Sequence, residues 1–136
     1  MDKALNYLAL ARKGGRVELG EEPVGAAARI GKAYLMIVAS DAGDHTWRRA
    51  KSYAAGTQQQ CVRVKYTKDE LGFAIGRTSL AMAAFTDAAL ALAFAKSLGG
   101  VQPEVLQALD DKAKRIKSRQ KEAKAHQRNV RMGKKK

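Results

Sequence analysis

Two apolar runs along the chain predict strands that are covered on both faces of a sheet. Residues 35–39 read Leu-Met-Ile-Val-Ala, and residues 80–85 are almost as continuously apolar. Residues 16–19 and 62–66 instead alternate apolar with charged or polar side chains, which is typical of strands with one exposed face. The pattern therefore predicts a sheet of four strands, of which two are fully buried.

Segments with apolar residues at helical spacing separate these strands. They predict helices over residues 3–12, 45–55 and 68–75, a helix that begins at Glu21 and is closed by Gly31, and a helix from Asp87 to Leu98. Asp44 and Asp87 are the expected caps of the helices that follow them. This alternation indicates an α/β fold with helices on both faces of one central sheet, for which residues 1–98 suffice.

The remaining residues, 99–136, are interpreted as a basic C-terminal extension of this domain. Apolar residues keep helical spacing from Val105 to Ile116, so we expect a helix over about residues 104–117, packed on the body or on a partner. Large apolar residues are then almost absent up to Val130. We expect residues 119–136 to be mobile in the free protein, because they bury too little surface to offset the entropy of ordering.

The net charge of +13 is concentrated in this extension. Residues 112–136 hold twelve basic residues and one acid, Glu122, whereas residues 1–111 hold fourteen basic residues and twelve acids. No aromatic residue lies among the cations of the extension, which favours contact with phosphates over stacking on bases. An anionic membrane surface and a merely solubilising role stay open as alternatives for this segment.

Composition excludes several classes of protein. No apolar run approaches the roughly 18 residues of a membrane span, and the segment after Met1 lacks the features of a signal peptide. One cysteine, Cys61, suits a reducing cytoplasm, and with only His45 and His126 beside it there is no plausible zinc set. Motifs of phosphate cradles, nucleophile elbows and histidine–carboxylate pairs are lacking. We therefore expect a cytoplasmic protein that is not an enzyme, with no cofactor, no small-molecule substrate and no membrane partner.

Aromatic residues divide into core candidates and one ambiguous case. Five are expected to lie in the core, and these are Tyr7, Tyr34, Phe73, Phe85 and Phe94; Cys61 is expected to be a small buried residue. Trp47 shares a predicted helix with Arg48, Arg49 and Lys51, which is compatible with a stacking surface for nucleic acid. A half-buried anchor is the more ordinary role of a single tryptophan.

Two stretches carry a more specific pattern. Residues 12–24 read Arg-Lys-Gly-Gly-Arg-Val-Glu-Leu-Gly-Glu-Glu-Pro-Val and are followed by the stretch 31–41, which begins with Gly31 and contains the apolar strand. Residues 67–77 read Thr-Lys-Asp-Glu-Leu-Gly-Phe-Ala-Ile-Gly-Arg and precede the strand that ends Phe85-Thr86-Asp87. Together they resemble the ribosomal L-seven-Ae and L-thirty-e family, most closely its bacterial YlxQ-type branch. The resemblance covers residues 3–98.

This resemblance implies a three-layer α-β-α sandwich that binds structured RNA, such as a kink-turn or ribosomal RNA. In the family, a glycine-led turn reads sheared G·A pairs, and the loop before the last strand contacts an extruded base. The two elements correspond here to Gly20, Glu21, Glu22 and Pro23, and to Gly76, Arg77, Thr78 and Ser79. Glu22, Pro23 and Ala26 occupy the positions of the family's asparagine, glutamate and lysine.

Cations flank the Gly20 turn in sequence. If Arg16, Arg29 and Lys32 share its edge, they would hold phosphates while the turn reads bases. The alternative is that these cations are ordinary solvated side chains and that Glu21 and Glu22 only stabilise the dipole of a capped helix.

We expect a monomer that binds structured RNA in a ribosomal or ribosome-assembly setting. The alternative is a protein–protein adaptor that binds through the helix over residues 87–98 and the segment 104–117, with the basic tail as a non-specific electrostatic anchor.

Overall fold

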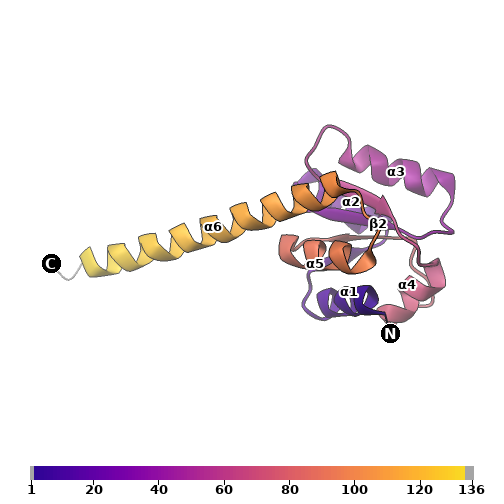
Figure 1. Cartoon of the computed structure of the whole chain (residues 1–136), viewed down its shortest axis with the longest axis horizontal. Coiled ribbons are helices and arrows are strands. Elements are labelled where there is room, and N and C mark those ends of the chain that lie inside the picture. The colour runs from indigo at the N-terminus through magenta and orange to yellow at the C-terminus, as the bar shows by residue number, and fades with distance from the viewer. Residues whose placement is uncertain (1, 134–136) are drawn as a thin grey trace.

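The computed structural model describes residues 2–133 of the chain, with side chains for residues 2–127. Helices and strands alternate as the sequence predicts (Figure 1). The elements are α1 (Lys3–Lys13), β1 (Val17–Leu19), α2 (Glu21–Arg29), β2 (Leu35–Val38), α3 (Asp44–Ala54), β3 (Gln60–Arg63), α4 (Lys68–Ala74), β4 (Met82–Phe85), α5 (Ala88–Leu98) and α6 (Pro103–Gly133).

The four strands form one mixed sheet in the order β1-β4-β2-β3. Strand β4 is antiparallel to β1 on one side and to β2 on the other, and β2 is parallel to β3. All four residues of β2 and of β4 are buried, whereas β1 alternates buried and exposed residues. The two continuous apolar runs are thus the two central strands, as their composition predicts.

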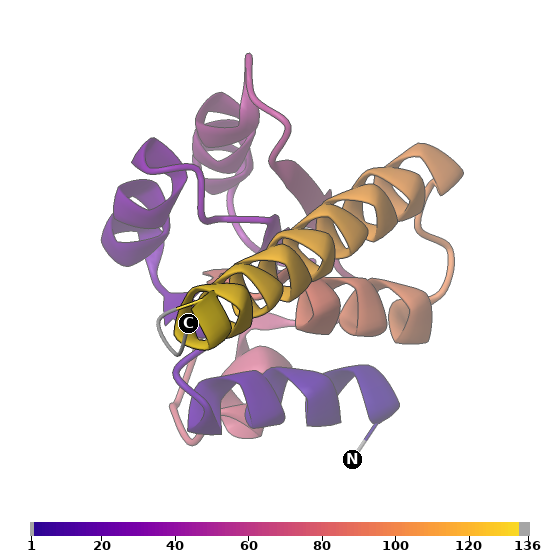
Figure 2. The same ribbon diagram turned by 90° about the vertical axis from the view of Figure 1, so that its left-hand side faces the viewer.

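Helices cover both faces of this sheet. Helices α2 and α3 lie on one face, and α1, α4 and α5 lie on the other, with α6 packed on α5 (Figures 1 and 2). The core between the layers includes Phe85 and Phe94, whose ring centroids lie 4.9 Å apart. The architecture is therefore the α-β-α sandwich that the resemblance implies.

Some local predictions differ from the structure. The strand expected over residues 62–66 is β3 at Gln60–Arg63, and its burial does not alternate. Gly43, not Asp44, is the N-cap of α3. The predicted cap of α5 is confirmed, because the side chain of Asp87 accepts a hydrogen bond from the backbone N–H of Leu90. Phe73 is 76% exposed rather than in the core. Helix α4 buries Leu71, Gly72 and Ala74, and Phe73 faces solvent because it lies on the opposite side of the helix from the centre of that buried face. Cys61 is only half-buried, although burial still raises the pKa of its thiol.

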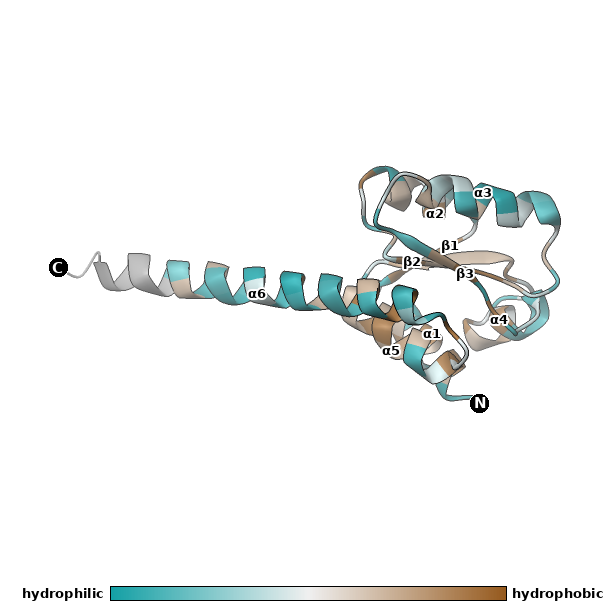
Figure 3. Ribbon diagram, turned by 45° about the horizontal axis from the view of Figure 1, so that its top comes forward, coloured by the Kyte–Doolittle hydropathy of each residue, from teal (hydrophilic) through white to brown (hydrophobic). Residues whose placement is uncertain are grey.

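The helix in the extension is longer than predicted. Helix α6 continues from Pro103 to Gly133, where the sequence analysis ends it near residue 117, and residues 134–136 of the expected mobile segment lie outside the described part of the chain. Its first half packs on the body, with Leu109 only 1% exposed, and its hydrophilic second half projects away (Figures 1 and 3). The helix is nucleated where it packs, and residues rich in Ala, Lys, Arg, Gln and Glu then extend it at low cost.

Gly72 in α4 lies where no side chain fits. A Cβ atom there would lie 2.7 Å from the backbone nitrogen of Ser79 and 2.8 Å from the carbonyl oxygen of Arg77. The backbone N–H of Arg77 also donates a hydrogen bond to the carbonyl of Gly72, at 2.8 Å. Helix α4 therefore supports the loop at residues 76–79 by direct backbone contact, which requires glycine at this position.

Replacing Gly72 by alanine is expected to lower the free energy of unfolding by about 1–3 kcal/mol, the usual cost of overpacking. The crowded atoms belong to the backbone, so they cannot rotate away as a side chain would. Urea denaturation measures the loss. Gly14→Ala is the control, because a Cβ atom at Gly14 meets nothing closer than 3.6 Å. Equal stabilities for the two variants would contradict the close contact.

Candidate nucleic-acid interface

The Gly20 turn and the loop at residues 76–79 lie at the same edge of the sheet. The backbone N–H of Gly20 donates a hydrogen bond to the carbonyl of Met82, the first residue of β4, at 2.9 Å. Strand β1 therefore ends where β4 begins, and the loop that leads into β4 lies beside the start of α2. We call this edge, formed by Gly20, Glu21, Glu22 and residues 76–79, the turn-and-loop edge.

Gly20 turns the chain from β1 into α2 with a backbone conformation that favours glycine. Its φ angle is +98°, in the region that side-chain-bearing residues rarely adopt. Among the described residues, no side chain caps α2, and Pro23 in its first turn has no N–H to donate. The backbone N–H groups of Glu21 and Glu22 thus remain available at a helix N-terminus, which can donate to an oxygen of a ligand.

The two glutamates at this turn differ in their surroundings. The carboxylate of Glu21 lies 3.6 Å from the guanidinium of Arg49 on α3, so it is already partnered within the protein. Glu22 is exposed, as are Pro23 and Ala26 on the same face of the turn. Glu22 can therefore accept hydrogen bonds from a ligand, whereas Glu21 serves mainly to tie α2 to α3.

The loop at residues 76–79 presents polar groups to solvent. Gly76, Arg77, Thr78 and Ser79 are all exposed, and within residues 2–127 no carboxylate forms an ion pair with Arg77. A free guanidinium can form paired hydrogen bonds to a phosphate or to a guanine edge, and the two hydroxyls can donate or accept. The loop therefore offers a cation and two hydroxyls beside the amides of α2.

Hydrogen bonds from neighbouring segments hold this loop in place. Lys68, at the start of α4, accepts from the backbone N–H of Leu80 at 3.0 Å and donates its own N–H to the carboxylate of Asp41 at 2.8 Å. Thr67 and Glu70 cap α4 reciprocally. Neither the Asp41 contact nor the Thr67–Glu70 capping box was predicted from the sequence. The threonine and glutamate at this spacing are a recognisable signal for the capping box.

The flanking cations do not share the turn-and-loop edge. Arg16 precedes β1, and Lys32 precedes β2, and both strands begin beside the end of β4. Arg29 ends α2, about 13 Å along the helix from Gly20 at 1.5 Å per residue. The prediction that these cations share the edge of the Gly20 turn is therefore wrong. The length of β1 separates Arg16 from the turn, and the length of α2 separates Arg29 and Lys32 from it. We call this opposite edge the distal edge.

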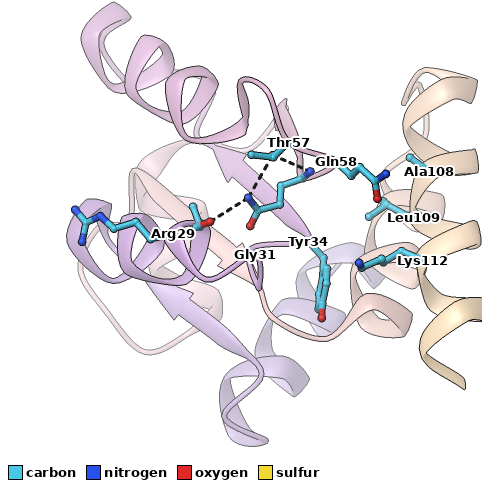
Figure 4. Close-up of a pocket in the computed structure, with 10 residues that line it drawn as sticks. Arg29, Gly31, Tyr34, Thr57, Gln58, Ala108, Leu109 and Lys112 are labelled. Atoms are coloured by element: carbon cyan, nitrogen blue, oxygen red, sulfur yellow. Dashed lines mark hydrogen bonds between the residues drawn. The ribbon is translucent and has the colours of Figure 1, made fainter. Parts of the chain in front are cut away.

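At the distal edge, two adjoining hollows that sequence reasoning did not identify lie between α6 and the segments that flank the strands. One, of about 300 Å³, has Arg29, Gly31, Tyr34, Leu109 and Lys112 among its lining residues (Figure 4). The other, of about 690 Å³, is lined on the body side by Arg16, Lys32, Tyr34 and Thr86, and on the α6 side by Ala113, Lys114, Ile116, Lys117 and Gln120. Only the docking of α6 creates these hollows, so no local pattern predicts them.

Trp47 is a half-buried residue packed against the core. Lys51 and Arg63 lie 5.7 and 5.6 Å from the centroid of its ring. Both cations are therefore engaged with the ring, which fits the anchor role better than a free stacking surface.

Within the described residues, no group of three or more histidine, cysteine or acidic residues is arranged to hold a metal ion. No described helix is both long and apolar enough to cross a membrane.

Comparison with known proteins identifies relatives by structure. No family model and no curated protein sequence matches the chain. A solved structure of a protein of unknown function from Bacillus halodurans is 30% identical and has a TM-score of 0.68, and the match covers 72% of this chain and 98% of that one. The Giardia lamblia 15.5kD RNA binding protein is 22% identical with a TM-score of 0.54, and the match covers 79% of this chain and 87% of that one.

The Giardia protein shows the shared fold, and the higher identity of the Bacillus protein over nearly its whole length shows kinship. The chain thus belongs to the same family as the Bacillus halodurans protein and has an L-seven-Ae-like fold.

Proposed function

We propose that this protein binds structured RNA through the turn-and-loop edge. The observation that carries the proposal is the hydrogen bond from Gly20 to Met82, which brings the glycine-led turn and the loop at residues 76–79 together. The shared fold with a Giardia protein named for RNA binding supports the same conclusion. The finer proposal is a YlxQ-type protein of the cytoplasm, acting as a monomer on a kink-turn or on ribosomal RNA, without enzymatic activity.

The geometry supports a division of labour at this edge. The exposed carboxylate of Glu22 would accept hydrogen bonds from guanine N–H groups, because an ionised carboxylate only accepts. Arg77 would contact a phosphate or an exposed base from the facing loop. The amide and the lysine charge that the family places at Glu22 and Ala26 are absent, so recognition here relies more heavily on the loop.

The projecting part of α6 would add phosphate contacts. Beyond Ser118 the sequence contains eight cations and one acid, Glu122. Residues 119–127 are exposed, and the cations among them ring the helix. Such charges raise association rate and affinity and add little selectivity, because every phosphate is alike.

A test of the loop is the double variant Arg77→Ala and Ser79→Ala. Loss of a positioned guanidinium is expected to weaken binding to a bulged, structured RNA by roughly 5- to 100-fold. Binding to an unstructured single strand should fall much less, because phosphate contacts elsewhere are retained. Fluorescence anisotropy with both RNAs gives the two dissociation constants.

The matched control for this pair is Arg48→Ala with Ser52→Ala, which removes the same groups from the exposed face of α3. It should leave the preference for structured RNA unchanged. Equal losses on both RNAs for the loop variant would argue against a specific site at the turn-and-loop edge.

A chain truncated after Ser118 tests the role of the projecting helix. The truncation keeps Leu109, Ala113 and Ile116, which pack against the core, and removes only residues beyond them. Affinity for RNA is expected to fall, and the slope of log K against log salt should become shallower, because fewer counterions are released. An unchanged slope would show that this segment does not contact phosphate.

A further inference from the structure

The strongest unassigned feature is the pair of hollows between α6 and the distal edge, which together we call the α6 groove. Six cations and one carboxylate are among the residues that line it. The carboxylate, Asp87, already forms an ion pair with Arg16. Lys114 is held 3.0 Å from Asp110, a hydrogen bond that raises the pKa of the Lys114 amine.

Three lysines of the groove remain without an acidic partner. Within residues 2–127, no carboxylate lies within ion-pair distance of Lys32, Lys112 or Lys117. Lys32 lies on the body side of the groove, and the other two lie on α6. Cations on two facing walls produce a stronger local potential than the same charges on a convex surface. Figure 4 shows Lys112 reaching from α6 toward the body, whereas the guanidinium of Arg29 points away from α6.

The lining favours a phosphodiester backbone over bases or lipid. Tyr34 lines both hollows, but the residue is only 9% exposed, and the Lys112 amine lies 5.8 Å from its ring centroid, so the ring is not open for a base to stack on. Thr86 and Gln120 add groups that donate hydrogen bonds to phosphate oxygens. Among residues 2–127, the large exposed apolar side chains are Leu10 on α1, Ile30 at the C-cap of α2 and Phe73 on α4, and these do not form the continuous apolar face that a membrane would require.

We propose that the α6 groove is a second RNA-binding site, which holds the backbone of a paired RNA segment on the side of the molecule opposite the turn-and-loop edge. The inference rests on the proposed function, since it assigns a further contact to the same binding activity. The two edges lie at opposite ends of strands of three or four residues, about 10–13 Å long. One protein can therefore contact two RNA segments at once.

The test uses the full chain and a fully paired RNA duplex without bulges, which offers nothing for the turn-and-loop edge to read. The groove variant is Lys32→Gln, Lys112→Gln and Lys117→Gln. The control variant is Arg119→Gln, Lys121→Gln and Lys124→Gln, which removes the same charge from exposed residues of α6 that do not line the groove. Anisotropy titrations at several salt concentrations give affinity and salt slope for each.

The groove variant should lower the magnitude of the salt slope by about 3, since each lost phosphate contact removes about one released counterion. The control variant should lower the magnitude of the salt slope by about 1, because cations that ring a helix cannot all face one RNA backbone. Equal reductions would overturn the groove site and leave only diffuse attraction by α6. A groove variant that no longer binds phosphatidylglycerol vesicles but binds the duplex as before would also overturn the groove site, and would indicate a lipid surface.

A second measurement guards against a groove variant that folds poorly. A photo-crosslinker attached at Gln120→Cys, in a Cys61→Ser background, should crosslink to the duplex, whereas the same probe at Arg48→Cys on α3 should not. Crosslinking at both positions or at neither contradicts the site.

The two proposals fail separately in this design. If Arg77→Ala with Ser79→Ala loses structured RNA while the groove variant behaves like its control, the proposed function stands and the groove fails. If the loop variant loses no preference for structured RNA while the groove variant selectively loses the duplex, the turn-and-loop edge fails and the groove stands.

Discussion

The antiparallel pairing of β4 with both of its neighbours determines where every candidate site lies. At its start, Met82 accepts the N–H of Gly20, which fixes the Gly20 turn beside the loop that enters β4. At its end, Phe85 accepts the N–H of Tyr34, and the next residue donates to Arg16. A shift of one residue in this register would move the buried residues of β4 to other positions and separate the paired segments at both ends.

The division of charge follows this arrangement. The turn-and-loop edge carries both signs, with Glu21 already paired with Arg49, so it suits the selective reading of base edges. The distal edge and α6 carry mostly cations, which suit contact with any phosphate. A net charge of +13 is thus not one signal but two, because the excess cations within residues 112–127 lie on a surface distinct from the one that would provide specificity.

Much of the fold could be predicted, because its elements are specified locally. The apolar runs of β2 and β4, the alternation in β1 and the aspartate cap of α5 all depend on near neighbours. Phe73 was mispredicted because an aromatic side chain in a short helix carries no sign of which face it occupies. The end of α6 differs from the prediction because a scarcity of apolar residues does not exclude a helix. A packed first half and high helix propensity suffice to extend it.

The sequence by itself determined the types of the elements, their order and the concentration of cations at the C-terminal end, since each depends on residues a few positions apart. Only the tertiary structure decided which ends of those elements meet. Gly20 and Arg77 come together through pairing between residues distant in the chain, while Arg16 and Arg29, near neighbours of Gly20 in sequence, are carried to the opposite edge. The α6 groove has the same origin, because it exists only where a helix from the end of the chain docks beside a sheet edge formed by its beginning.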